Sequence, residues 1–176
     1  MADTLRRFFA FPNPVNEVSA RLVAGGVVLM STATIVFDQR WLTAVIAYGF
    51  VARVLTGPTA SPLGQFVTRI VTPRLPAKAK LVPGPPKRFA QGIGAAVSVP
   101  TAVLALGFGL TDVAYPLLGL LIVAATLESV FAICLGCTIF AWLMRVGAIP
   151  ESVCVECNNI WLRTRLPDAE PAVEAG

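Results

Sequence analysis

Long apolar stretches with few charges limit what this chain can fold into. Residues 18–37 are twenty residues with a single charge, Arg21, and residues 89–111 are twenty-three residues with none. A helix of about 20 apolar residues crosses the roughly 30 Å hydrocarbon layer of a bilayer. Only 14% of all residues are charged, against about a quarter in a soluble domain. The sequence therefore predicts an all-α integral membrane protein in contact with the lipid bilayer.

Two further stretches complete a predicted bundle of four transmembrane helices. Residues 41–55 are short for a span, so this helix crosses only if the bilayer thins or Arg53 reaches the interface. Residues 116–144 carry Glu128 as their only charge and are predicted to form one long, tilted helix. In the span over 89–111, Pro100 is expected to kink the helix because it lacks a backbone donor.

The connection 58–88 fixes the predicted topology, because it contains six Lys or Arg residues and no Asp or Glu. Basic loops stay in the cytoplasm, so this loop and both termini are predicted to be cytoplasmic in a multi-pass protein of the cell membrane. Residues 64–71 are expected to form a short interfacial helix. Topology and attraction to anionic lipids explain these charges, and nucleic-acid binding is not expected. The chain thus divides into a membrane domain, 1–160, and a polar tail, 161–176, expected to be disordered.

The four cysteines form two CxxC pairs, Cys134 with Cys137 and Cys154 with Cys157, with sixteen residues between the pairs. Four thiolates at this spacing are typical of a zinc or iron–sulfur site, whereas each pair alone has the spacing of a redox dithiol. The chain has no histidine, so a metal would be held by thiolates, carboxylates or backbone. On the predicted topology all four cysteines face the reducing cytoplasm, where a structural disulfide is not expected.

Glu128 is the second residue that needs a chemical explanation. A carboxylate inside a span is costly unless it is protonated, paired or facing a polar cavity. On one continuous helix it would lie about 120° from Cys134 and about 180° from Cys137, away from the thiols. Proton transfer or substrate contact is one interpretation. The other is a hydrogen bond to a hydroxyl of a neighbouring helix, with three candidates: Ser31, Thr32 and Thr34.

Three motifs, PPKRFAQGIG, LESVFAICLGC and SPLGQFVTRIVTPRL, resemble a bacterial family of small membrane proteins catalogued as domain of unknown function 4395. The resemblance covers residues 13–157 and is most specific in the CLGC element that follows a Glu. It implies a four-helix membrane domain without an assigned activity. Such proteins are often encoded near thioredoxin-like and sulfurtransferase proteins, which implies thiol or sulfane-sulfur handling. The motifs that carry the resemblance include Glu128, Cys134 and Cys137. The pair in the tail, Cys154 and Cys157, is expected in only a subset of the family.

Three functional hypotheses follow from these residues. In the first, the protein performs thiol–disulfide exchange or sulfane-sulfur transfer at the cytoplasmic side. Cys134 and Cys137 are then the membrane-side reactive pair, Cys154 and Cys157 exchange with a thioredoxin-like or sulfurtransferase partner, and Glu128 accepts a proton. In the second, the four cysteines hold zinc or an iron–sulfur cluster. In the third, Glu128 serves small-solute transport, for which the chain would form a homo-oligomer to enclose a path.

Overall fold

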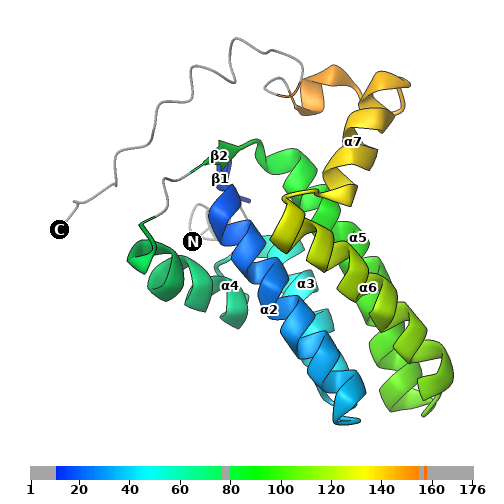
Figure 1. Ribbon diagram of the computed structural model, residues 1–176. Coiled ribbons are helices and arrows are strands. Elements are labelled where there is room, and N and C mark those ends of the chain that lie inside the picture. Colours follow the sequence, from blue (N-terminus) through cyan, green and yellow to red (C-terminus); the bar gives the residue numbers. More distant parts are fainter. Residues whose placement is uncertain (1–10, 77–79, 155–156, 158–176) are drawn as a thin grey trace, which may run out of the picture.

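The computed structural model describes residues 11–76, 80–154 and 157, and helices dominate them, which confirms the all-α class (Figure 1). Two short strands, β1 (Val15–Asn16) and β2 (Leu81–Val82), form an antiparallel pair. The α-helices are α2 (Glu17–Val36), α3 (Leu42–Thr56), α4 (Pro62–Phe66), α5 (Gly84–Ala102), α6 (Thr111–Phe131) and α7 (Leu135–Arg145). The π-helical and 3₁₀ segments are η1 (Val67–Val71), η2 (Thr72–Arg74), η3 (Val103–Gly107) and η4 (Glu151–Val153).

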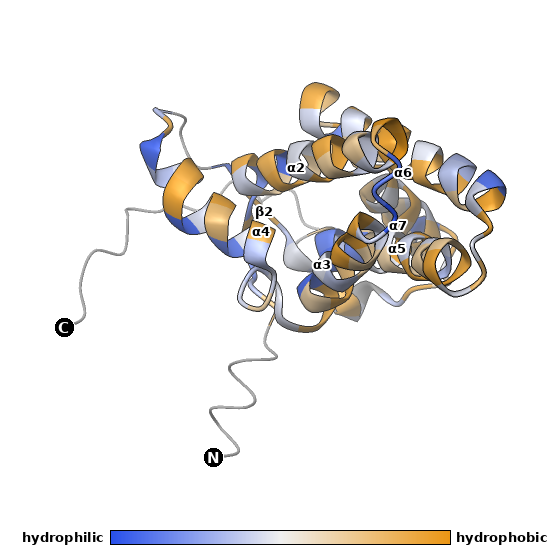
Figure 2. Ribbon diagram, turned by 90° about the horizontal axis from the view of Figure 1, so that it is seen from below, coloured by the Kyte–Doolittle hydropathy of each residue, from blue (hydrophilic) through white to orange (hydrophobic). Residues whose placement is uncertain are grey.

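Three helices within the described residues are long and apolar enough to cross a membrane: α2, α5 continued by η3, and α6. The other two apolar helices, α3 and α7, have 15 and 11 residues. Figure 2 shows apolar residues along the helices of the bundle, and many large apolar side chains face outward, as Leu29 and Leu120 do. The chain is therefore suited to a lipid environment, with three helices of spanning length rather than the predicted four.

The bundle is held together by the pairing of α2 with α6 and of α3 with α5, and α5 also packs on α6. Small residues allow close approach, since a side chain at Gly94 of α5 would collide with the ring of Phe50 of α3. A buried apolar cluster lies between the helices, formed by Ala24, Val27, Ile46, Phe50, Leu118, Leu121 and Ala125.

The two ends of the bundle differ in what they carry (Figure 1). The α2–α3 turn lies at one end, where the Tyr115 hydroxyl donates a hydrogen bond to Asp38. The hydrogen bond from Tyr115 and, to a smaller extent, the one from Arg40 hold the pKa of the exposed Asp38 carboxyl below its usual range. The strand pair and α7 lie at the other end, whereas α4 lies beside the middle of α2, with Leu63 near Gly26. The end of the basic loop, at β2, and the first CxxC pair therefore lie at the same end of the bundle.

The strand pair ties the residues before α2 to the end of the basic loop. The Glu17 carboxylate lies 2.7 Å from the ammonium of Lys80, and the Glu17 amide donates to the Lys80 carbonyl at 2.8 Å. One residue earlier, Asn16 caps α2 by accepting from the amide of Val18. Residues 64–71 are helical, as expected, although as parts of α4 and the π-helical η1. The predicted disordered tail, 161–176, lies outside the described residues.

The third predicted span starts five residues too late. Helix α5 begins at Gly84, because Pro85 and Pro86 fit the first turn of a helix, where a missing amide proton costs nothing. Lys87, which the sequence placed in the cytoplasmic loop, is consequently a helical residue and only 7% exposed. Further along, α5 gives way to the π-helical η3 three residues after Pro100, whose missing donor weakens the α-helical ladder there.

The prediction of one helix over residues 116–144 is wrong. Helix α6 ends at Phe131, Ala132 adopts a left-handed conformation with φ 58°, and α7 begins only at Leu135. A left-handed alanine costs about 1–2 kcal/mol, so contacts elsewhere must favour the break. Arg21 of α2 supplies one, because its guanidinium donates at 3.0–3.1 Å to the carbonyls of Ser129 and Val130 at the C-terminal end of α6.

Candidate thiol site at the N-terminus of α7

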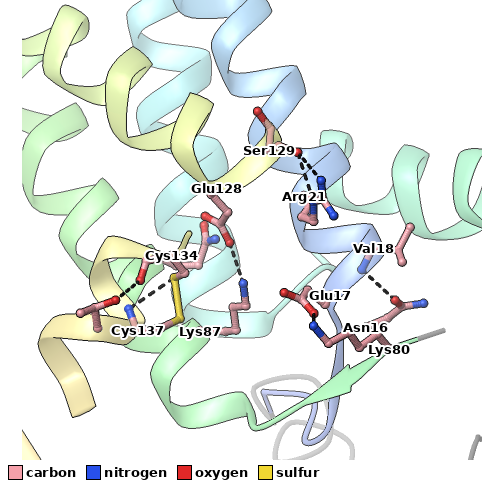
Figure 3. A network of polar contacts seen from close by, with 12 residues as sticks. Asn16, Glu17, Val18, Arg21, Lys80, Lys87, Glu128, Ser129, Cys134 and Cys137 are labelled. Atoms are coloured by element: carbon pink, nitrogen blue, oxygen red, sulfur yellow. Dashed lines mark hydrogen bonds and ion pairs between the residues drawn. A yellow bond between two sulfur atoms is a disulfide. The ribbon is translucent and has the colours of Figure 1, made fainter. Parts of the chain in front are cut away.

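The break before α7 places the first CxxC pair at a helix N-terminus. Cys134 is the N-cap residue, and its sulfur accepts a hydrogen bond from the amide of Cys137 at 3.3 Å. The two residues are joined as a disulfide with their Cα atoms 5.2 Å apart, and both are half-buried (Figure 3). Unpaired amides at a helix N-terminus stabilise negative charge, so a thiolate at Cys134 is favoured by its position.

A cavity of about 200 Å³ lies beside Cys134, bounded by α2, α3, α5, α6 and the first turn of α7. Most of its wall is apolar. Four lining residues bring polar side chains to it, namely Arg53, Gln91, Glu128 and Cys134. Glu128 and Cys134 therefore share one cavity, which corrects the prediction that Glu128 points away from the thiols. The angular prediction assumed one continuous helix, and the turn at Ala132 redirects the chain between the two residues.

Glu128 is paired with Lys87 across the α5–α6 contact, with 2.8 Å between the carboxylate oxygen and the ammonium nitrogen (Figure 3). Their side chains are 15% and 9% exposed, so water screens the pair only weakly. The expected hydrogen bond between Glu128 and a hydroxyl of α2 is not formed, because Glu128 pairs with Lys87 instead. Thr34 donates to the carbonyl of Met30. Ser31 Oγ is buried without a hydrogen-bond partner among the described residues. Sequence reasoning missed Lys87 because it follows two prolines in a basic run and was assigned to the loop.

Arg53 is buried in the bundle rather than extended to the interface, since it is only 6% exposed. Its Nε donates to Gln91 Oε1 at 2.8 Å and its Nη1 to Ser61 Oγ at 3.1 Å, while its guanidinium carbon lies 4.6 Å from the centroid of the Phe50 ring. Arg53, Gln91 and Glu128 thus bring polar side chains from α3, α5 and α6 to the wall of one cavity. Sequence reasoning named Arg53 but not Gln91.

Helix α7 is held against α5 by a close backbone approach. A Cβ atom built on Gly136 would lie 2.5 Å from both Cα and Cβ of Ala90, so only glycine fits this contact. One turn further along α7, the rings of Phe140 and Phe89 pack with their centroids 5.6 Å apart. Gly136, which lies between the two cysteines, therefore fixes the thiols against the helix that carries Lys87 and Gln91.

The second pair, Cys154 and Cys157, is also joined as a disulfide, with 5.3 Å between the Cα atoms. Cys154 is only 4% exposed and follows η4. Within the described residues, which include all four cysteines, no three Cys, Asp, Glu or His side chains are gathered as metal ligands would be. The four sulfurs thus form two separate disulfides, and the tetracysteine arrangement of the metal hypothesis is not assembled.

The profile of a protein family described as Domain of unknown function (DUF4395) matches residues 15–145. The chain belongs to this family. The match confirms the resemblance and covers β1 through α7, with Glu128, Cys134 and Cys137 inside it. Cys154 and Cys157 lie beyond the DUF4395 match. No curated protein and no solved structure matches the sequence.

Proposed function

We propose that this DUF4395 protein is a membrane thiol–disulfide exchange protein whose reactive pair is Cys134 and Cys137. The observation that carries the proposal is the position of Cys134, which caps α7 and also lines the cavity. A CxxC pair at the start of a helix combines a stabilised thiolate with a second thiol one turn away, as exchange chemistry requires.

The exchange proceeds in two balanced steps. The Cys134 thiolate attacks one sulfur of a partner disulfide, which forms a mixed disulfide and releases the other partner sulfur as a thiolate. The Cys137 thiolate then attacks Cys134 Sγ, which closes the Cys134–Cys137 disulfide and releases the second partner thiol. The same steps in reverse reduce the pair. Glu128, on the cavity wall with Cys134 and held by Lys87, is the proposed acceptor of the thiol proton.

The partner on the soluble side is proposed to be a thioredoxin-like or sulfurtransferase protein. The end of the basic loop, at β2, and α7 lie at the same end of the bundle, so a protein that approaches this end meets both. The tail pair, Cys154 and Cys157, is the proposed intermediate dithiol between that partner and Cys134. Because it lies outside the DUF4395 match, it is an addition to the membrane pair rather than part of the core mechanism.

Trapping of the mixed disulfide tests this proposal. The Cys137→Ser variant, with both tail cysteines changed to serine and the protein in nanodiscs, is treated with glutathione disulfide and analysed by intact mass. We expect one glutathione adduct on Cys134, because the thiol that would resolve it is gone. The matched Cys134→Ser variant should form at least several-fold less adduct on Cys137. Equal adducts on the two variants, or none on either, would refute the assignment of Cys134.

A further inference from the structure

We infer that the cavity beside Cys134 binds the ring of a membrane quinone, which takes two electrons from the Cys134–Cys137 dithiol. This inference rests on the proposed function and adds the class of its electron acceptor. It follows from the size of the cavity, from the exposed apolar residues among its lining and from the hydrogen-bond donors on its wall.

The cavity is large enough to hold one small six-membered ring. Its volume is about 200 Å³, and an apolar protein cavity of about 150 Å³ binds benzene. A substituted benzoquinone ring therefore fits with little space to spare. The apolar residues that make up most of the wall also disfavour water, so an apolar ring competes well for the space.

Several residues that line the cavity are also exposed on the outside of the bundle. Leu120 of α6 is 59% exposed, and Leu135 and Ile139 of α7 are 42% and 44% exposed. Because these lining side chains are apolar and partly exposed, the proposed entry to the cavity lies between them, on a side of the bundle that would face lipid. A quinone reaches this entry from the bilayer, and its hydrocarbon tail can stay among the acyl chains.

The wall of the cavity supplies hydrogen-bond donors for a quinone oxygen. The side-chain oxygen of Gln91 accepts a hydrogen bond from Arg53, and none of the described residues accepts a hydrogen bond from the side-chain nitrogen of Gln91. The guanidinium of Arg53 lines the same wall. A lipid acyl chain would offer these donors no acceptor. A quinone satisfies a donor and is also reducible by two electrons, which matches the dithiol beside it.

The reaction balances without a further reagent. Two S–H bonds break and one S–S bond forms between Cys134 and Cys137, while two electrons and two protons convert the quinone to a quinol. Glu128, paired with Lys87, is the side chain on this wall that can carry a proton between the thiols and the ring oxygen. The soluble partner then regenerates the dithiol by the exchange steps described above.

Quinone reduction by the full chain in nanodiscs tests the inference. The protein is reduced, freed of reductant and mixed with decylubiquinone, and quinol formation is followed by absorbance. We expect two quinols per chain, one from the Cys134–Cys137 dithiol and one from the tail dithiol that re-reduces it, and one quinol when both tail cysteines are changed to serine. Peptide mass should then show a new Cys134–Cys137 disulfide. Ala124→Leu, which fills the cavity, should slow quinol formation at least tenfold, whereas Ala141→Leu on the exposed face of α7 should not. Equal rates for the two variants would overturn the inference.

Two further results separate this inference from the proposed function. If glutathione disulfide oxidises the pair and decylubiquinone does not, the quinone site is wrong and the exchange function stands. If neither oxidises the pair, the exchange function itself fails. Should Ala124→Leu not fold, photolabelling of the unmodified chain with an azidoquinone replaces it. We expect label on cavity residues of α5, α6 and α7, and label confined to other segments would overturn the site.

Discussion

A methyl group on Gly136 should separate α7 from α5 and weaken the thiol site. The added Cβ would lie 2.5 Å from Cα and Cβ of Ala90, whereas carbon atoms pack at about 3.5–4.0 Å. Helix α7 must therefore retreat by about 1 Å at its first turn. Overpacking of this kind costs about 1–3 kcal/mol, partly offset by the roughly 1 kcal/mol that alanine gains over glycine in a helix.

Gly119→Ala is the matched control for Gly136→Ala. A Cβ at Gly119 of α6 meets nothing within 4 Å, so this variant gains the helical preference of alanine without the collision. We expect Gly136→Ala to be less stable than Gly119→Ala by about 1–3 kcal/mol. At about 2–4 °C per kcal/mol, the gap in Tm is roughly 2–12 °C in nanodiscs. Equal Tm values for the two variants would refute the close packing of α7 on α5.

The remaining predictions concern the buried ion pair and the topology. Lys87→Met should destabilise the protein by about 3–5 kcal/mol because it leaves the Glu128 carboxylate buried and unpaired, and the double variant Lys87→Met with Glu128→Leu should recover most of the lost Tm. No recovery in the double variant would contradict the pair. For topology, in a chain whose four cysteines are replaced by alanine, Arg74→Cys should resist a membrane-impermeant maleimide added to intact cells, whereas Gln39→Cys should react. The reverse labelling pattern would invert the orientation.

Local sequence was enough to locate the helices of spanning length. Apolar length located α2 and most of α5, because about 20 residues are needed to cross a bilayer whatever the helices contact. It detected α6 only as part of a longer helix whose two ends were wrong. The CxxC spacing and the isolated carboxylate also marked Cys134 and Glu128, which the structure brings to one cavity. These features depend on length and residue type alone.

The break before α7 depends on a distant contact and could not be read from local sequence. The segment around Ala132 contains neither Gly nor Pro before Cys134, so it reads as a continuous helix. The guanidinium of Arg21, more than a hundred residues earlier, satisfies the last carbonyls of α6. Lys87 was missed for a related reason, since its burial depends on Glu128 forty-one residues later. Tertiary pairing thus decided the details of the site.

The relative reactivity of the two membrane cysteines tests the central claim most directly. With the tail pair changed to serine, Cys137→Ser leaves Cys134 as the one cysteine and Cys134→Ser leaves Cys137. Each variant is mixed with an excess of a small maleimide at pH 7, and the second-order rate is measured by mass. A helix N-terminus stabilises negative charge by about 0.3–2 kcal/mol, which is a factor of roughly 2–30 in thiolate. We predict that Cys134 reacts faster by a factor in this range, and an equal or faster rate at Cys137 would contradict the account.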